Sequence, residues 1–128
     1  MEAGAAKKFI RFWFPVIVYS GIIFCVSSIP SVTVPLSEVQ FDKILHILEY
    51  LPFGFLVSRG IYGTCSSCSP TILWFLVVFV TLLYGLGDEY HQSFVSGRSS
   101  GGIDLLADVI GGVLGGYAHL LFRKKFES

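Results

Sequence analysis

Charged residues are scarce in this chain. They make up 14% of its 128 residues, whereas soluble globular domains average about 25%. Hydrophobic residues reach 53%, which argues against a soluble domain and favours a chain that lies in a membrane. Clusters of basic residues are lacking except near the termini. Nucleic-acid binding and soluble-enzyme function are therefore without support.

The alternation of apolar and polar residues that marks a membrane β-strand is also missing. Instead, four apolar segments occupy residues 9–28, 42–62, 70–90 and 103–122. Each is near the roughly 17–25 residues that a spanning helix needs, and lipid offers open backbone groups no partners. We therefore predict an all-α fold, a four-helix transmembrane bundle in which residues 1–128 form a single membrane domain. The first segment could instead be a cleaved signal peptide, but its apolar run is long and no small-x-small cleavage site follows it.

Basic residues predict how the bundle is oriented. In a four-span protein both termini and the connection between the second and third segments share one side. That side holds seven of the nine basic residues, namely Lys7, Lys8, Arg11, Arg59, Arg123, Lys124 and Lys125. The positive-inside rule makes this side cytoplasmic. We expect both termini in the cytoplasm and the chain in the bacterial cytoplasmic (inner) membrane.

Acidic residues have the opposite distribution. Seven of the nine are expected on the outer side, namely Glu38, Asp42, Glu49, Asp88, Glu89, Asp104 and Asp108. Membrane proteins seldom keep ionisable groups near lipid without a use for them. We therefore predict a polar pocket at the outer headgroup level, built from the second, third and fourth segments.

The second segment contributes two neighbouring polar stripes. Asp42, His46 and Glu49 share one helical face, and Lys43, His46 and Tyr50 form the stripe beside it. Glu49 lies roughly 10 Å deeper than Asp42 at the helical rise. A carboxylate at that depth needs a partner, and we expect another helix to supply it.

The third and fourth segments and the loop between them complete the predicted pocket. Asp88, Glu89 and Gln92 close the third segment, and Asp104 and Asp108 open the fourth. Arg98 is the only arginine on this side, and its forked donors suit a carboxylate or a phosphate.

Three chemistries fit these residues. The first is acid–base catalysis, with Asp88 or Glu89 as the acid or base and His46 as its partner. The second is anion recognition, with Arg98 as the anchor. The third is a divalent metal, which we do not predict because no strong ligand signature such as His-Glu-x-x-His is present; no cofactor is predicted either. The predicted substrate-binding residues are Asp42, Lys43, Glu49, Tyr50, Gln92, Arg98, Asp104 and Asp108. For Asp42, Asp104 and Arg98, ion pairs and caps that merely join helices are an equal alternative.

Cysteines are few, and two of them have redox-motif spacing. Cys65 and Cys68 are separated by two serines, but no thioredoxin-like strand and helix surround them. Their predicted cytoplasmic placement favours free thiols, and an oxidised pair would count against the predicted orientation.

Small residues recur along one face of the fourth segment. Gly111 and Gly115 form one Gly-xxx-Gly pair and Gly112 and Gly116 another, a spacing that lets helices approach closely. We expect this face to pack inside the bundle; the alternative is a docking face for a membrane-protein partner or a second copy. His119, near the inner end, is expected to be an interfacial or packing residue.

Three motifs together resemble a known family. Residues 42–54 read Asp-Lys-x-x-His-x-x-x-Tyr-x-x-x-Gly, residues 88–98 read Asp-Glu-x-x-Gln-x-Phe-x-x-Gly-Arg, and residues 104–115 read Asp-x-x-x-Asp-x-x-Gly-x-x-x-Gly. Their ordered combination resembles VanZ-like membrane proteins. The chain departs from that pattern at Ser96, where Pro is usual, and at Asp108, where Asn is usual. By motif, the resemblance assigns function to Asp42, Lys43, His46, Tyr50, Asp88, Glu89, Gln92, Arg98, Asp104 and Asp108.

The resemblance implies a small integral membrane protein whose family is linked to glycopeptide resistance. Resistance itself does not follow, since a shared fold does not fix a shared task. We expect the protein to recognise or modify a cell-envelope or lipid-headgroup substrate, with membrane lipid as its environment. Whether it is an enzyme stays open. The alternative is a non-catalytic accessory subunit of a larger membrane complex, held through the Gly111/Gly115 face.

Overall fold

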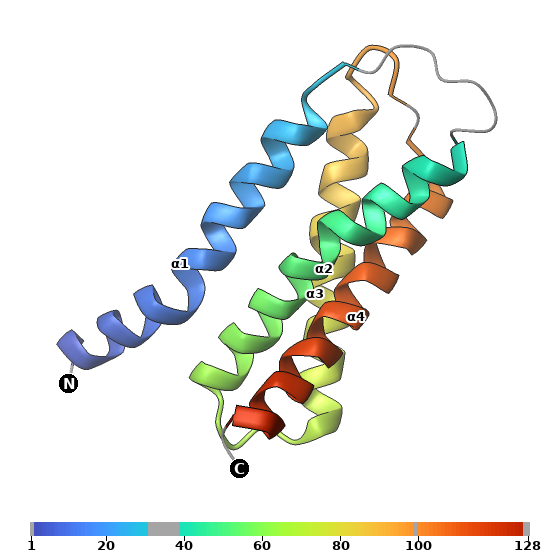
Figure 1. Cartoon of the computed structure of the whole chain (residues 1–128). Helices are drawn as coiled ribbons and strands as arrows, with labels where there is room; N and C mark the ends of the chain where they lie inside the picture. Colours follow the sequence, from blue (N-terminus) through green and yellow to red (C-terminus); the bar gives the residue numbers. More distant parts are fainter. Residues whose placement is uncertain (1, 31–38, 99, 127–128) are drawn as a thin grey trace.

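The computed structural model describes residues 2–30, 39–98 and 100–126 and contains four helices (Figure 1). They are α1 (Glu2–Ser27), α2 (Val39–Thr64), α3 (Pro70–Gln92) and α4 (Gly102–Phe126). No strand occurs in these three ranges, so the all-α prediction is confirmed. α1 begins earlier and α4 ends later than predicted, because the basic residues that flank both apolar segments are themselves compatible with a helix.

Each helix is long and apolar enough to cross a membrane. Large apolar side chains cover the outside of the bundle: Ile22, Phe75, Leu83 and Leu121 are each at least half exposed. Such a surface fits lipid and not water, since soluble monomers rarely expose large contiguous apolar patches. The chain is therefore a multi-pass membrane protein. Both termini and the α2–α3 connection lie at one end of the bundle, as four spans require (Figure 1).

Glycines allow α2 and α4 to approach closely. A Cβ atom on Gly115 would collide with the carbonyl oxygen of Leu51, and one on Gly111 with the carbonyl oxygen of Ile47. Gly54 of α2 faces Gly112 of α4 in the same way. The predicted internal packing is what the structure shows, so the Gly111/Gly115 face is occupied by α2 of the same chain.

α1 packs mainly against α2 and also contacts α3. Its buried side chains include Val16 and Ile23. Polar contacts hold it in register: the Tyr19 hydroxyl donates to the Glu49 carbonyl at 2.7 Å, and the Tyr84 hydroxyl donates to the Ser20 carbonyl at 2.5 Å. α1 is thus held to α2 and α3 by a few specific contacts.

The start of α3 follows the local sequence. Ser69 is the N-cap, its hydroxyl accepts from the Ile72 amide at 3.3 Å, and Pro70 occupies the first helical turn. After α3, Gly97 adopts a φ of 76° and turns the chain toward α4, a conformation that favours glycine.

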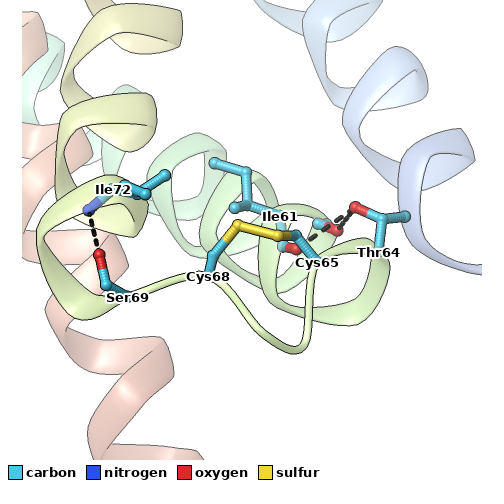
Figure 2. The surroundings of a disulfide bond; sticks show 7 residues. Ile61, Thr64, Cys65, Cys68, Ser69 and Ile72 are labelled. Carbon is cyan, nitrogen blue, oxygen red and sulfur yellow. Dashed lines mark hydrogen bonds between the residues drawn. A yellow bond between two sulfur atoms is a disulfide. The ribbon is translucent and has the colours of Figure 1, made fainter.

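Cys65 and Cys68 form a disulfide in the α2–α3 connection (Figure 2). The prediction of free thiols is wrong. A tight turn brings the two cysteines together. The Cys68 amide donates to the Cys65 carbonyl at 3.3 Å, and the two Cα atoms are 5.5 Å apart, within the range that a disulfide requires.

Candidate functional site

α2 and α4 begin and α3 ends at the end of the bundle opposite the termini (Figure 1). Buried polar side chains gather on these helix ends. The structure brings together most residues that the sequence singled out. The buried members from α2, α3 and α4 are His46, Tyr50, Asp88, Glu89, Gln92, Asp104 and Asp108. With Lys43, Asp42, Glu49 and Ser27, they are named the polar cluster below. Glu38 lies outside the described residues.

An ion pair joins the beginnings of α2 and α4 in this cluster. The Lys43 ammonium contacts Oδ1 of Asp104, whose side chain is buried, and lies 4.0 Å from Oδ2 of Asp42. Because Asp104 is buried and Lys43 only partly exposed, this pair is shielded from water and holds the two helix ends together.

His46 lies between carboxylates of two helices. Its Nδ1 is 2.7 Å from Oδ1 of Asp108 on α4, and its Nε2 is 3.9 Å from Oδ2 of Asp42 on α2. Both His46 and Asp108 are buried. A carboxylate on Nδ1 fixes the ring's orientation and its tautomer, which is the arrangement that an acid–base histidine needs.

Asp88 is the centre of a second group. Its Oδ1 accepts from the Ser27 hydroxyl at 2.5 Å, and its Oδ2 accepts from the Tyr50 hydroxyl at 3.2 Å and from the Gln92 amide at 3.3 Å. The Gln92 amide also donates to Ser27 at 3.2 Å. These bonds join α1, α2 and α3 around one buried carboxylate.

Glu89 and Glu49 are less fully satisfied. Oε2 of Glu89 accepts from the Gly101 amide at 2.9 Å, whereas its Oε1 has no hydrogen-bond partner among the described residues. Oε1 of Glu49 and Oδ2 of Asp108 likewise have no hydrogen-bond partner among the described residues. Another helix was expected to supply a partner for the Glu49 carboxylate, but none is found for its Oε1 among the described residues. Tyr19 of α1 donates only to the Glu49 backbone carbonyl. Buried polar atoms without a partner are rare and point to a ligand, a water or a proton.

Arg98 caps α1. Its Nε donates to the Ile29 carbonyl and its Nη2 to the Val26 carbonyl, both at 3.0 Å. A cation at a helix C-terminus satisfies open carbonyls and complements the helix dipole. Nearby, the His91 ring stacks on Phe24 with centroids 4.4 Å apart. In the structure these two residues hold α1 to the α3 end, so the predicted anion anchor is engaged with carbonyl groups.

A cavity of about 380 Å³ opens between α1 and α3 beside the polar cluster. Most of its lining is apolar, including Val16 and Phe24 of α1 and Val80 and Leu83 of α3. Asp88 and His91 are its charged or ionisable lining residues at the α3 C-terminal end. The apolar lining of the cavity therefore adjoins a buried carboxylate of the cluster.

Two overlapping sets of side chains have donor atoms close enough for one metal ion. One set is Asp42, His46 and Asp104; the other is His46, Glu89 and Asp108. In each set the candidate ligand atoms lie within 4.8 Å of one another.

Comparison with known families decides the relationship of the chain. A family model described as VanZ/LLP1 matches residues 5–123. The chain belongs to the VanZ/LLP1 family. The resemblance seen in the motifs is thereby confirmed, and the match extends over all four helices. No curated protein and no solved structure matches the chain.

The VanZ/LLP1 motifs correspond to distinct parts of the cluster. The first motif supplies Lys43, His46 and Tyr50, and the third supplies both carboxylates that pair with them, Asp104 and Asp108. Where the family pattern has Asn, Asp108 gives His46 a charged partner. Ser27 was not singled out as a site residue, although it is 1% exposed and donates to Asp88. Its only sequence signal is its place in Ser27-Ser28-Ile29-Pro30, at the end of the first apolar segment.

Proposed function

We propose that this VanZ/LLP1 protein recognises the headgroup of a lipid, or of a lipid-linked cell-envelope substrate, at the polar cluster. The observation that carries this proposal is the cavity between α1 and α3. Its apolar lining suits an acyl or isoprenoid chain, and Asp88 and His91 offer a headgroup hydrogen-bonding partners at its end. A water-soluble substrate would gain no binding energy from an apolar cavity that opens between membrane helices.

The cluster also supports a chemical step on the bound headgroup. The His46 imidazole, held by Asp108 at 2.7 Å, is the group suited to accept or donate a proton. Glu89 and Asp88 are the neighbouring carboxyl groups, as expected from the sequence. In this scheme Lys43 and Asp104 fix the helix ends, and Arg98 positions α1 as one wall of the cavity.

The proposed orientation places the termini in the cytoplasm and the polar cluster on the outer side of a bacterial inner membrane. Arg11, Arg59 and Arg123 line a cavity of about 490 Å³ at the terminal end, which suits the anionic lipids of a cytoplasmic leaflet. The disulfide between Cys65 and Cys68 at this end is evidence against that orientation, because the cytosol keeps thiols reduced. We base the proposed orientation on the basic residues, since they lie on three separate helices, whereas a two-serine turn brings the sulfurs together in any compartment.

Thiol labelling in intact cells tests the orientation. Cys25 is replaced by Ser, so that Cys65 and Cys68 are the remaining thiols, and cells are treated with a membrane-impermeant maleimide before and after permeabilisation. Cytoplasmic termini predict labelling only after permeabilisation in the presence of a reductant, which opens the disulfide. Labelling of intact cells after a reductant is added would place the disulfide outside and reverse the orientation.

Native mass spectrometry of protein purified in mild detergent tests the proposed function. Val80→Trp fills the cavity from α3, and Leu86→Trp, on the lipid-facing side of the same helix, is the matched control. We expect wild type and Leu86→Trp to retain a bound lipid and Val80→Trp to lose it about tenfold. Equal lipid retention by all three proteins would contradict the proposal, and a stoichiometric protein partner in place of lipid would favour the accessory-subunit alternative.

A further inference from the structure

Three helices each contribute one potential metal ligand to a single buried point. They are His46 of α2, Glu89 of α3 and Asp108 of α4. All three side chains are buried, and their donor atoms lie within 4.8 Å of one another. Ligands from three separate helices would need no loop to move, because helix packing fixes their positions.

Two of these ligands have unused oxygens. Oε1 of Glu89 and Oδ2 of Asp108 are buried and accept no hydrogen bond from the described residues. Asp108 is fully buried and Glu89 is 8% exposed. The other oxygen of each carboxylate is engaged, Oε2 of Glu89 with the Gly101 amide and Oδ1 of Asp108 with His46. The unused oxygens are thus positioned by the contacts that the other oxygen of each carboxylate makes.

The negative charges of Glu89 and Asp108 favour a bound cation. Glu89 and Asp108 together bring two negative charges into a buried site when ionised, and burying unpaired charge is costly. The ammonium of Lys43, on α2, is paired with Asp104. A divalent ion between Glu89 and Asp108 would balance both carboxylates.

We propose that His46, Glu89 and Asp108 bind one divalent transition-metal ion. One imidazole nitrogen and two carboxylate oxygens favour Zn²⁺ or Mn²⁺ over Mg²⁺ and Ca²⁺, which prefer all-oxygen sites. This site goes beyond the proposed function: none of its three ligands lines the cavity, although Glu89 follows Asp88, which does. With the ion bound, His46 is a metal ligand and no longer the group that accepts or donates a proton. This metal site was not predicted from the sequence, because its ligands are spread over three helices without a local signature.

Metal titration of the purified protein tests the site. Protein stripped with a chelator is titrated with Zn²⁺, Mn²⁺ and Mg²⁺ by isothermal titration calorimetry, in detergent without added lipid. We expect one Zn²⁺ or Mn²⁺ per chain and weaker binding of Mg²⁺. Glu89→Gln keeps the side chain's shape but removes its charge, and we expect it to weaken Zn²⁺ binding about 100-fold, at the upper end of what losing one supporting group does.

Two controls locate the ion. His119→Gln removes a histidine at the opposite end of the bundle and should leave Zn²⁺ affinity unchanged. Asp42→Asn tests the overlapping set of Asp42, His46 and Asp104; if this variant loses the ion while Glu89→Gln keeps it, the proposed ligands are wrong. Circular dichroism checks that each variant retains its helices.

Cobalt substitution provides a readout that needs no variant. Co²⁺ held by nitrogen and oxygen ligands of low coordination number absorbs visible light more strongly than aqueous Co²⁺. We expect that stronger band in the wild-type protein, and Zn²⁺ should remove it. No calorimetric binding and a spectrum of aqueous Co²⁺ would overturn the proposal and leave a shared proton on the two carboxyl groups as the explanation. Val80→Trp separates the two proposals: it should lose lipid and keep Zn²⁺, so failure of the lipid test does not imply failure of the metal test.

Discussion

The Nδ1 atom of His46 lies 2.7 Å from Oδ1 of Asp108, and neither residue is exposed by more than 3%. The two residues are 62 positions apart in the chain and join the first and third family motifs. A histidine in this setting has one nitrogen fixed by a carboxylate. Its other nitrogen lies 3.9 Å from Oδ2 of Asp42. The pair therefore links the fold of α2 against α4 to the chemistry proposed for the site.

Removing the carboxylate of Asp108 should destabilise the protein. Asp108→Ala leaves His46 buried without its partner, and we expect the free energy of unfolding to fall by about 3 kcal/mol. Asp108→Asn keeps an oxygen that can accept from His46, so the loss should be about 1 kcal/mol. Unfolding in mixed detergent micelles, followed by circular dichroism, measures both. Asp42→Ala, at a partly exposed carboxylate, is the control, and a larger loss there than in Asp108→Ala would contradict this role.

A methyl group on Gly115 should prevent close packing of α2 against α4. Its Cβ would collide with the Leu51 carbonyl oxygen, a backbone atom that cannot rotate away. We expect Gly115→Ala to lower the free energy of unfolding by about 2 kcal/mol or to prevent accumulation of the protein. Gly21→Ala in α1 is the matched control, since nothing lies within 4 Å of its added Cβ. Equal thermal stability of the two variants would show that α2 and α4 are not packed as described.

Ser27 should matter more than its place in the sequence suggests. Ser27→Ala removes a donor to Asp88 and an acceptor for Gln92, and we expect a loss of about 1 kcal/mol, typical of a buried hydrogen bond between membrane helices. Ser93→Ala, at an exposed serine after α3, provides the comparison. The measurement is thermal unfolding of the two proteins side by side. A larger effect at Ser93 would refute the proposed link between α1 and the cluster.

The main role of Arg98 should be to cap the C-terminus of α1. Its effect on the charge of the polar cluster should be secondary. Arg98→Ala frees the Val26 and Ile29 carbonyls, so amide hydrogen exchange near the C-terminus of α1 should rise several-fold while exchange in α4 stays constant. Arg98→Lys restores the charge but only one donor group, and we expect partial protection. Unchanged exchange in Arg98→Ala would favour the original assignment of Arg98 as an anion anchor.

Local patterns in the sequence were sufficient for the four helices and for the meeting of their polar ends. Long apolar segments in lipid leave no alternative to helix, and four spans bring the start of α2, the end of α3 and the start of α4 to one side. The cap at Ser69 and Pro70 was predictable for the same reason, since its contacts span only three residues. The glycine spacing of α4 likewise predicted close packing.

Pairings between distant residues were not predictable in this way. Which group Lys43, His46 or Arg98 contacts depends on how the helices are rotated about their axes, and hydropathy does not report this rotation. Asp104, Asp108 and the carbonyls of α1 are the partners that result. The cavity between α1 and α3 is likewise a property of the packed chain. The disulfide was missed because the compartment was inferred from charge, whereas the turn geometry brings Cys65 and Cys68 together.

A crystal structure of the protein in a lipidic mesophase doped with bacterial membrane lipid would test the proposed recognition most directly. We expect a lipid tail between α1 and α3, along Val80 and Leu83, and a headgroup within hydrogen-bonding reach of Asp88 or His91. A lipid-free cavity with the headgroups elsewhere on the bundle, or polar side chains that no longer meet at the ends of α2, α3 and α4, would contradict it.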